Sequence, residues 1–296
     1  MRDFIIYKAS TSLGDLDKLK MHVSLLLVVV LGCTAVYAGS IRSPGDYRER
    51  IVSESARSPG TAQSRIIGGE KATIEKYPFA VSLQNNGTFF GHQVEHFCGG
   101  SIVGEKWIIT SAQCALRIQV RKFHVRAGSN SYYEHGAIYA VKNTEIHPAY
   151  NAINYDYDVG LVELSENIKF DNTKQPIKLP KFHSALEDGA QVQVLGWGAS
   201  VLLGPVSEEL LCSTMQKINN HDCQEASGGD LLTHRMFCAL SNTASACVGD
   251  SGSPLIYNGT LFGVTSWSRS CMLEYPTAYT AISEVSDWIT KVTGVA

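Results

Sequence analysis

The sequence lacks several features that would assign it to common classes of protein. Neither sign of charge dominates, because 25 basic and 28 acidic residues give a formal net charge of −3, which argues against nucleic acid or an anionic membrane as a partner. None of the eight cysteines forms a Cys-x-x-Cys pair, so a zinc site is not expected. The sequence predicts no metal and no cofactor. What remains is an ordinary globular composition, 44% hydrophobic and 18% charged, in a chain long enough for a large core.

The sequence also lacks an apolar run as long as a membrane span, which takes about 20 residues. Its one apolar stretch, residues 25–31, follows two lysines and ends in small residues, with Val36 and Ala38 at the −3 and −1 positions of a cleavage site. We interpret residues 21–38 as a secretory signal peptide, with a membrane anchor as the alternative. If translation starts at the second methionine, residues 1–20 are an upstream extension.

The remainder of the chain divides into a polar segment and one domain. Residues 39–65 are rich in Ser, Arg, Gly and Pro and have no apolar periodicity, which predicts a flexible propeptide. Residues 66–296 read as a single domain. Cys33 lies in the segment expected to be removed, so an odd number of cysteines remains, and in a secreted chain this leaves one free or intermolecular thiol.

Strand patterns recur at short intervals in this domain, separated by Gly, Asn, Asp or Pro. They are expected at residues 79–83, 101–103, 107–110, 123–127, 159–164, 191–195, 261–266 and 278–280. The absence of intervening helical patterns and of any internal repeat favours an all-β sandwich or a pair of barrels. One helix is expected at the C-terminus, where Val285, Trp288, Ile289 and Val292 share a face.

One stretch carries most of the candidate chemistry. Residues 247–254 read Cys-Val-Gly-Asp-Ser-Gly-Ser-Pro, which places Ser251 between small residues directly after Asp250. Little side-chain bulk would shield the serine oxygen on such a loop, and the backbone N–H groups of Gly249 and Ser251 can turn towards one point, as an oxyanion requires. We interpret the stretch as the loop of a nucleophilic serine, with a Gly/Ser turn beside a disulfide as the alternative.

This stretch resembles the nucleophile loop of the chymotrypsin/trypsin-like serine proteases, and other motifs extend the resemblance over residues 66–296. They are His-Phe-Cys-Gly-Gly-Ser-Ile at 96–102, Trp-Ile-Ile-Thr-Ser-Ala-Gln-Cys at 107–114, Ile-His-Pro-Ala-Tyr at 146–150, Asp-Val-Gly-Leu-Val at 158–162, Gly-Trp-Gly at 196–198 and Thr-Ser-Trp at 265–267. The resemblance implies an all-β fold of two six-stranded antiparallel β-barrels with a C-terminal helix.

The resemblance also implies the covalent links of the domain. Its disulfides would be Cys98–Cys114, Cys223–Cys238 and Cys247–Cys271, which leaves Cys212 over as a free thiol. Each closed loop should stabilise the fold by about 2–4 kcal/mol.

The sequence Arg-Ile-Ile-Gly-Gly at 65–69 resembles the family's activation cleavage point. Cleavage after Arg65 would free the amine of Ile66, which in the family pairs with the acid before the nucleophile, here Asp250. A buried acid requires such a partner charge. The alternative is a linker that is never cut.

The family's mechanism uses a serine, a histidine and an aspartate, and here the histidine is missing. Asp158 and Ser251 occupy the aspartate and serine positions, but Gln113 stands at the histidine position. A carboxamide is not basic enough to accept the serine proton near neutral pH, so it cannot act as the general base. Loss of the catalytic histidine in a serine protease lowers turnover about a millionfold, and we expect the same order of loss here.

No other histidine lies at a motif position that would deliver it to the serine. The candidates considered are His92, His96, His124, His135, His147, His183, His221 and His234.

The expected specificity pocket departs from the family in the same direction. Ser245 stands where trypsin-like members carry an acid, so a basic side chain would find no ion pair there. Ser268 and Thr277 replace glycines that are usual in active relatives, and their side chains narrow the slot beside Ser266 and Trp267. Each change alone is compatible with drift, but together with the missing histidine they indicate a site released from catalytic demands.

Two sequons for N-glycosylation begin at Asn86 and Asn258. Each is also an Asn-Gly pair, so a simple turn is the alternative at both positions.

The sequence therefore predicts a secreted serine protease homologue without peptidase activity. It would bind a protein or peptide, such as an active protease or its substrate, and regulate extracellular proteolysis. The alternative is a weakly active endopeptidase of chymotrypsin- or elastase-like preference, which rests on the retained Asp158, Ser251 and Gly249. A third interpretation is an intermolecular disulfide through Cys212.

Overall fold

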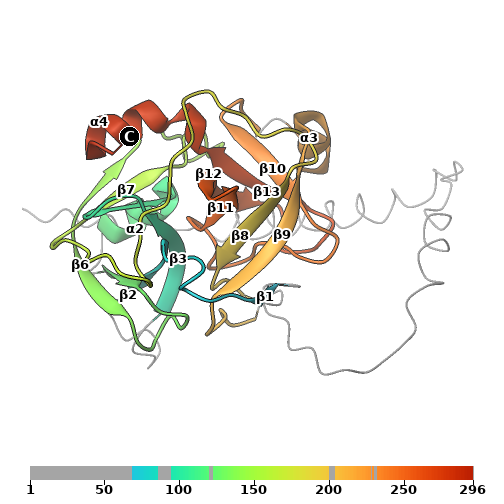
Figure 1. Cartoon of the computed structure of the whole chain (residues 1–296). Helices are drawn as coiled ribbons and strands as arrows, with labels where there is room; N and C mark the ends of the chain where they lie inside the picture. Colours follow the sequence, from blue (N-terminus) through green and yellow to red (C-terminus); the bar gives the residue numbers. More distant parts are fainter. Residues whose placement is uncertain are drawn as a thin grey trace, which may run out of the picture. The chain divides into compact units, whose positions relative to one another are not determined.

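A computed structural model describes residues 69–85, 95–119, 123–199, 204–227, 229 and 232–295 (Figure 1). The expected upstream extension, signal peptide and propeptide, the cleavage point at Arg65 and Ile66, the sequon at Asn86 and the side chain of His92 lie outside the described residues. Their assignments stay predictions.

The first barrel is closed by six antiparallel strands in the order β2-β3-β4-β7-β6-β5. The strands are β2 (Ala80–Asn85), β3 (Glu95–Ile102), β4 (Trp107–Thr110), β5 (Phe123–Ala127), β6 (Ala137–Ile146) and β7 (Gly160–Leu164). Aliphatic side chains such as Leu83, Ile109 and Leu161 are fully buried inside it. Burial of this kind contributes about 25 cal/mol per Å² of apolar surface and is the main force that closes the barrel.

The second barrel is built from the later strands. They are β8 (Gln191–Gly196), β9 (Leu211–Ile218), β10 (Met236–Leu240), β11 (Pro254–Tyr257), β12 (Thr260–Ser268) and β13 (Thr277–Ala281). Strands β8 and β9 pair and so close the sheet, and the short β1 (Glu70–Lys71) adds to the other edge of β9. The predicted pair of six-stranded antiparallel barrels is confirmed.

Three α-helices are present among the described residues: α2 (Ala112–Gln119), α3 (Asn220–Ser227) and α4 (Ser286–Thr293), the last preceded by the 3₁₀ turn η2 (Ile282–Glu284). Helix α4 confirms the expected C-terminal helix, and its Trp288 packs edge-on against His147 of the first barrel. The expectation that no helix separates the strands was wrong, because α2 and α3 do. Both have only eight residues, which is shorter than the window in which a helical period can be recognised, and α3 buries only Cys223 among its residues.

Disulfides join the elements in the three predicted pairs, Cys98–Cys114, Cys223–Cys238 and Cys247–Cys271, and Cys212 is a free cysteine. The Asn-Gly pair at Asn258 forms the two-residue turn between β11 and β12, with φ of 48° at Asn258 and 71° at Gly259. Positive φ at both central residues is what a tight hairpin turn requires. None of the helices in the described ranges is long and apolar enough to cross a membrane.

Candidate active site

Helix α2 brings Gln113 to the site. Ser111 precedes the helix as its N-cap, and the Ser111 hydroxyl accepts a hydrogen bond from the backbone N–H of Cys114 at 3.3 Å. The N–H groups of the first turn have no partner within the helix. That of Gln113 donates to Asp158 Oδ1 at 3.0 Å, so the buried carboxylate completes the helix terminus.

Asp158 precedes β7 and is completely buried. Its Oδ2 accepts hydrogen bonds from the Ser266 hydroxyl at 2.6 Å and from Gln113 Nε2 at 2.9 Å. Burial raises the pKa of the Asp158 carboxyl, and the hydrogen bonds from Ser266 and Gln113 offset part of that rise because they favour the charged form.

The Gln113 side chain occupies the position of a base but cannot do its chemistry. Its Nε2 donates one hydrogen to Asp158 Oδ2 and the other to the Ser266 carbonyl oxygen at 2.8 Å. Both partners can only accept, which fixes the nitrogen on that side of the amide. The atom left over is the amide oxygen, which is far too weakly basic to take a proton from the serine hydroxyl.

Ser251 lies on the loop between β10 and β11, held from both sides by backbone hydrogen bonds. Its carbonyl accepts from the N–H of Gly99 at 2.9 Å, and the N–H of Gly252 donates to Thr265 at 2.8 Å. Gly249 has φ of 98°, a conformation that L-residues rarely adopt. Among the described residues, the Ser251 hydroxyl makes no hydrogen bond, so no neighbouring group activates it.

His96 contacts this loop, but both of its ring nitrogens already have hydrogen-bond partners. Its Nε2 donates to the carbonyl oxygen of Gly249 at 3.0 Å, and its Nδ1 accepts from the Ser82 hydroxyl at 2.8 Å. Burial lowers the pKa of His96 to about 4, so the ring is neutral. Both ring nitrogens are therefore engaged, and His96 supports the loop instead of serving as a base.

Asp250, next to the serine, is a second buried acid. Its carboxylate accepts from the backbone N–H groups of Gly198 and Cys247, each at 2.9 Å. A Cβ at Gly198 would stand 2.2 Å from this carboxyl group, so the close fit requires glycine there. Burial raises the pKa of Asp250 to about 7, because the two hydrogen bonds offset only part of the desolvation.

A cavity of about 240 Å³ opens between the two barrels beside Gln113 and Ser251. The other residues that line it are Tyr155, Ala246, Cys247, Val248, Thr265, Ser266, Trp267, Ser268, Ser270, Cys271 and Thr277. None of them has a charged side chain.

The structure places the predicted pocket residues in different roles. Ser266, Trp267, Ser268 and Thr277 line the cavity, whereas Ser245 is buried and does not. The Ser268 hydroxyl lies 2.8 Å from the carbonyl oxygen of Ser270 and 3.1 Å from that of Pro276. These contacts hold its side chain against the wall of the cavity. The lining residues Tyr155 and Val248 were missed in the sequence, because nothing in their local pattern indicates that they approach the serine.

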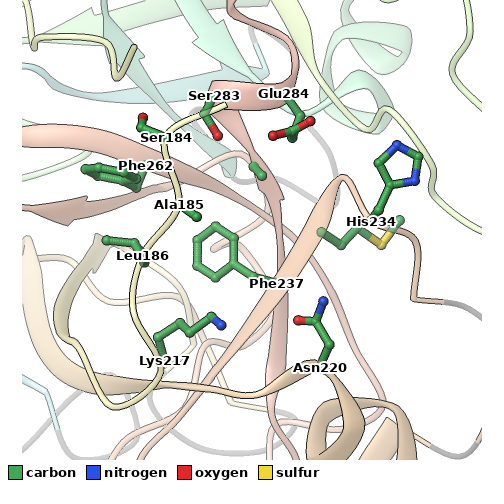
Figure 2. A pocket seen from close by; sticks show the side chains of 12 residues that line it. Ser184, Ala185, Leu186, Lys217, Asn220, His234, Phe237, Phe262, Ser283 and Glu284 are labelled. Atoms are coloured by element: carbon green, nitrogen blue, oxygen red, sulfur yellow. The ribbon is translucent and has the colours of Figure 1, made fainter. Parts of the chain in front are cut away.

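A smaller cavity of about 140 Å³ lies elsewhere on the second barrel (Figure 2). Figure 2 shows the ring of Phe237 between Lys217 and Asn220 at one end and Ser283 and Glu284 at the other. Its charged rim is already paired, because Lys217 contacts Asp188 and Glu284 contacts His183 at 3.1 Å. No cluster of potential metal ligands is found among the described residues.

A nucleophile loop on one β-barrel and a buried aspartate on the other define the serine-protease class of fold. The comparisons with known proteins agree. The Trypsin family model matches residues 66–289, so the chain belongs to the trypsin family.

Several insect proteins, two of them trypsins by name, are similar to this chain over most of their length. Trypsin 5G1 of Aedes aegypti is 35% identical over 79% of this chain and 87% of its own length. The trypsin of Phaedon cochleariae is 34% identical over 78% and 89%, and hypodermin-B of Hypoderma lineatum is 36% identical over 77% and 87%.

Proposed function

We propose that this chain is a secreted, catalytically silent trypsin homologue that acts as a binding or regulatory protein in extracellular proteolysis. The observation that supports it best is the double donation by Gln113 Nε2, to Asp158 and to the Ser266 carbonyl. The amide thereby replaces the orienting contacts of an imidazole without its basicity. The signal-like segment at residues 21–38 and the three disulfides favour secretion.

We also propose that cleavage after Arg65 completes the fold. In the uncut chain the nitrogen of Ile66 is an uncharged peptide nitrogen, and a free amine would give the buried Asp250 its opposite charge. The raised pKa of Asp250 supports this pairing, because an acid in that state gains from a cationic neighbour.

A fluorophosphonate probe tests the silent-site proposal, because it reacts only with a serine whose hydroxyl is activated. We expect the Arg65-cleaved protein to label far more slowly than an active trypsin treated in parallel. Stoichiometric labelling at the rate of the active enzyme would contradict the proposal.

The second candidate function is a weakly active endopeptidase with chymotrypsin- or elastase-like preference. The retained Asp158, Ser251 and Gly249 favour it. Gln113→His separates the two candidates, because a gain of orders of magnitude shows that the base alone was missing. No gain would show that the pocket is disabled as well.

A further inference from the structure

We infer that a cavity where β1 meets β9, the β1 cavity, binds a small zwitterion of the kind that a free amino acid or a dipeptide forms. The inference is independent of the proposed function, because none of the residues that line this cavity lines the cleft beside Gln113 and Ser251. Three observations on the described residues support it: a polar lining, a buried hydroxyl without a partner, and charges of both signs at one site.

The β1 cavity has a volume of about 340 Å³, which lies within the range of small-molecule sites. It is found where β1 pairs with Leu211 and Cys212 of β9 (Figure 1). Apart from Ala72 and Ala244, every residue that lines it has a side chain that can form hydrogen bonds. Such a lining suits a polar ligand, because polar groups lose their hydration at no gain in an apolar cavity.

Ser213 lines the β1 cavity and carries a buried hydroxyl without a partner. The residue is 4% exposed, and its Oγ makes no hydrogen bond within the described part of the chain. A buried hydroxyl in this state is unfavourable, and folded proteins rarely keep one. A polar ligand in the cavity can supply the missing hydrogen bond.

The β1 cavity presents charges of both signs. Lys76 and Glu70 line it, and neither forms an ion pair with any other described residue. A second lysine of the lining, Lys71, lies 4.0 Å from Glu209, which is not part of the lining. A simple anion would be repelled by Glu70 and a simple cation by the two lysines, whereas a zwitterion gives each sign a partner.

The free thiol of Cys212 is part of the same lining, where its Sγ lies 3.4 Å from the Tyr77 hydroxyl. Burial is the main cause that raises the pKa of Cys212, while the charge of Lys76 lowers it and that of Glu70 raises it. Both charges therefore lie close enough to act on the thiol. A ligand that contacts Lys76 and Glu70 should shield the thiol from reagents in solution.

The test compares L-alanine and L-alanyl-L-alanine with versions of each that lack one charge. The N-acetyl versions lack the ammonium group, and the C-terminal amides lack the carboxylate. Isothermal titration calorimetry on the uncut chain gives the dissociation constants. We expect a zwitterion to bind about fivefold more tightly than either of its blocked versions, because each blocked version loses one ion pair.

The tighter of the two zwitterions identifies the source of the ligand, a free amino acid or a short peptide. Blocked versions that bind as tightly as their zwitterion would overturn the inference. No binding of either zwitterion up to about 10 mM would overturn it as well.

Three variants locate the ligand in the β1 cavity. Ser213→Ala should weaken zwitterion binding about fivefold, yet without ligand it should resist urea at least as well as the wild type, because it removes an unpartnered hydroxyl. Lys76→Gln should weaken zwitterion binding about fivefold but leave binding of the amide version unchanged, since that version has no carboxylate. The matched control is Lys291→Gln, at an exposed lysine of α4 outside the lining, and it should change neither. Unchanged binding in Ser213→Ala, or equal effects of the two lysine changes, would contradict the site.

Modification of Cys212 gives a second measurement that does not depend on heat. At about ten times its dissociation constant, the zwitterion leaves roughly one chain in eleven unoccupied. Reaction of the thiol with an aromatic disulfide reagent should then slow about tenfold, with Cys212→Ser as the background. A rate that the bound zwitterion leaves unchanged would show that the ligand lies elsewhere and would overturn the inference.

Discussion

At the scale of single residues, Gln113 fills the structural role of the histidine that the family has at this position. Gln113 donates to Asp158 from both its backbone N–H and its Nε2, so the buried carboxylate is satisfied without an imidazole. This explains why the fold can tolerate the substitution. A buried acid left without donors would be costly, whereas the missing base affects only chemistry.

Gln113→Ala should therefore destabilise the fold even though it removes no activity. The variant deprives Asp158 of a hydrogen bond to a charged acceptor, which costs about 1.5–3 kcal/mol. Urea unfolding of the variant and of the wild type measures the difference. Gln113→His is the control, since an imidazole N–H can still donate to Asp158, and equal stability of all three proteins would contradict this account.

The second prediction concerns Asp250 and pH. Its folded pKa of about 7 exceeds the ordinary value of 3.8, so the folded uncut chain holds a proton that the unfolded chain has released. Stability should then fall as pH rises from about 4 to about 7, by at most about 4 kcal/mol.

Urea midpoints of the uncut chain at pH 5 and pH 8 check this slope. Asp250→Asn should flatten it, because the variant has no proton to lose. Cleavage after Arg65 should flatten it as well, because the amine of Ile66 would stabilise the charged carboxylate. A slope that is the same in all three proteins would assign the effect to other groups.

At the scale of elements, an ion pair between Asp156 and Arg235 links the loop before β7 to the second barrel. Burial raises the pKa of Asp156, but the hydrogen bonds from Arg235 and Thr233 outweigh it and leave the pKa below its usual value. A lowered folded pKa contributes stability above the unfolded pKa, near 3.9, and that contribution is lost as the pH falls through the folded value.

Arg235→Gln should accordingly cost about 2 kcal/mol at pH 7, where Asp156 is charged and loses a charged donor. The gap between variant and wild type should close as the pH falls below 3, because protonation of Asp156 removes the interaction from both proteins. Thermal unfolding at the two pH values checks this. A gap that persists at low pH would mean that packing of the guanidinium on Tyr157 carries the effect.

The elements also show where sequence reasoning succeeds and where it stops. Strands with continuous buried aliphatic residues, such as β4 and β7, were predicted almost to their ends. Strand β6 was missed because most of its side chains are at least partly exposed, and β11 because it begins with Pro254. The motif residues Gln113, Asp158 and Ser251 do meet in space, but the resemblance to a family, and not periodicity, brought them together.

At the scale of the whole molecule, the state of Cys212 determines whether a disulfide can link this chain to another. Its thiol lies 3.4 Å from the Tyr77 hydroxyl beside a cavity of about 340 Å³, and burial raises its pKa. Less thiolate means slower exchange with a disulfide, so we expect Cys212 to stay a free thiol.

We therefore expect the purified protein to run as a monomer on a non-reducing gel, and its thiol to react more slowly with an aromatic disulfide reagent than a free cysteine does. Cys212→Ser is the control for both measurements. A heavier band in the wild type that reducing agent and Cys212→Ser both abolish would establish the intermolecular disulfide instead.

The central claim is that a trypsin scaffold has kept its cleft and lost its base. The most direct test is kcat/KM of the Arg65-cleaved protein on peptides with varied residues before the scissile bond, beside Gln113→His and with Ser251→Ala as background. The account predicts that the wild type turns over none of them measurably above Ser251→Ala. Turnover by the wild type at a rate normal for trypsins, abolished in Ser251→Ala, would contradict it.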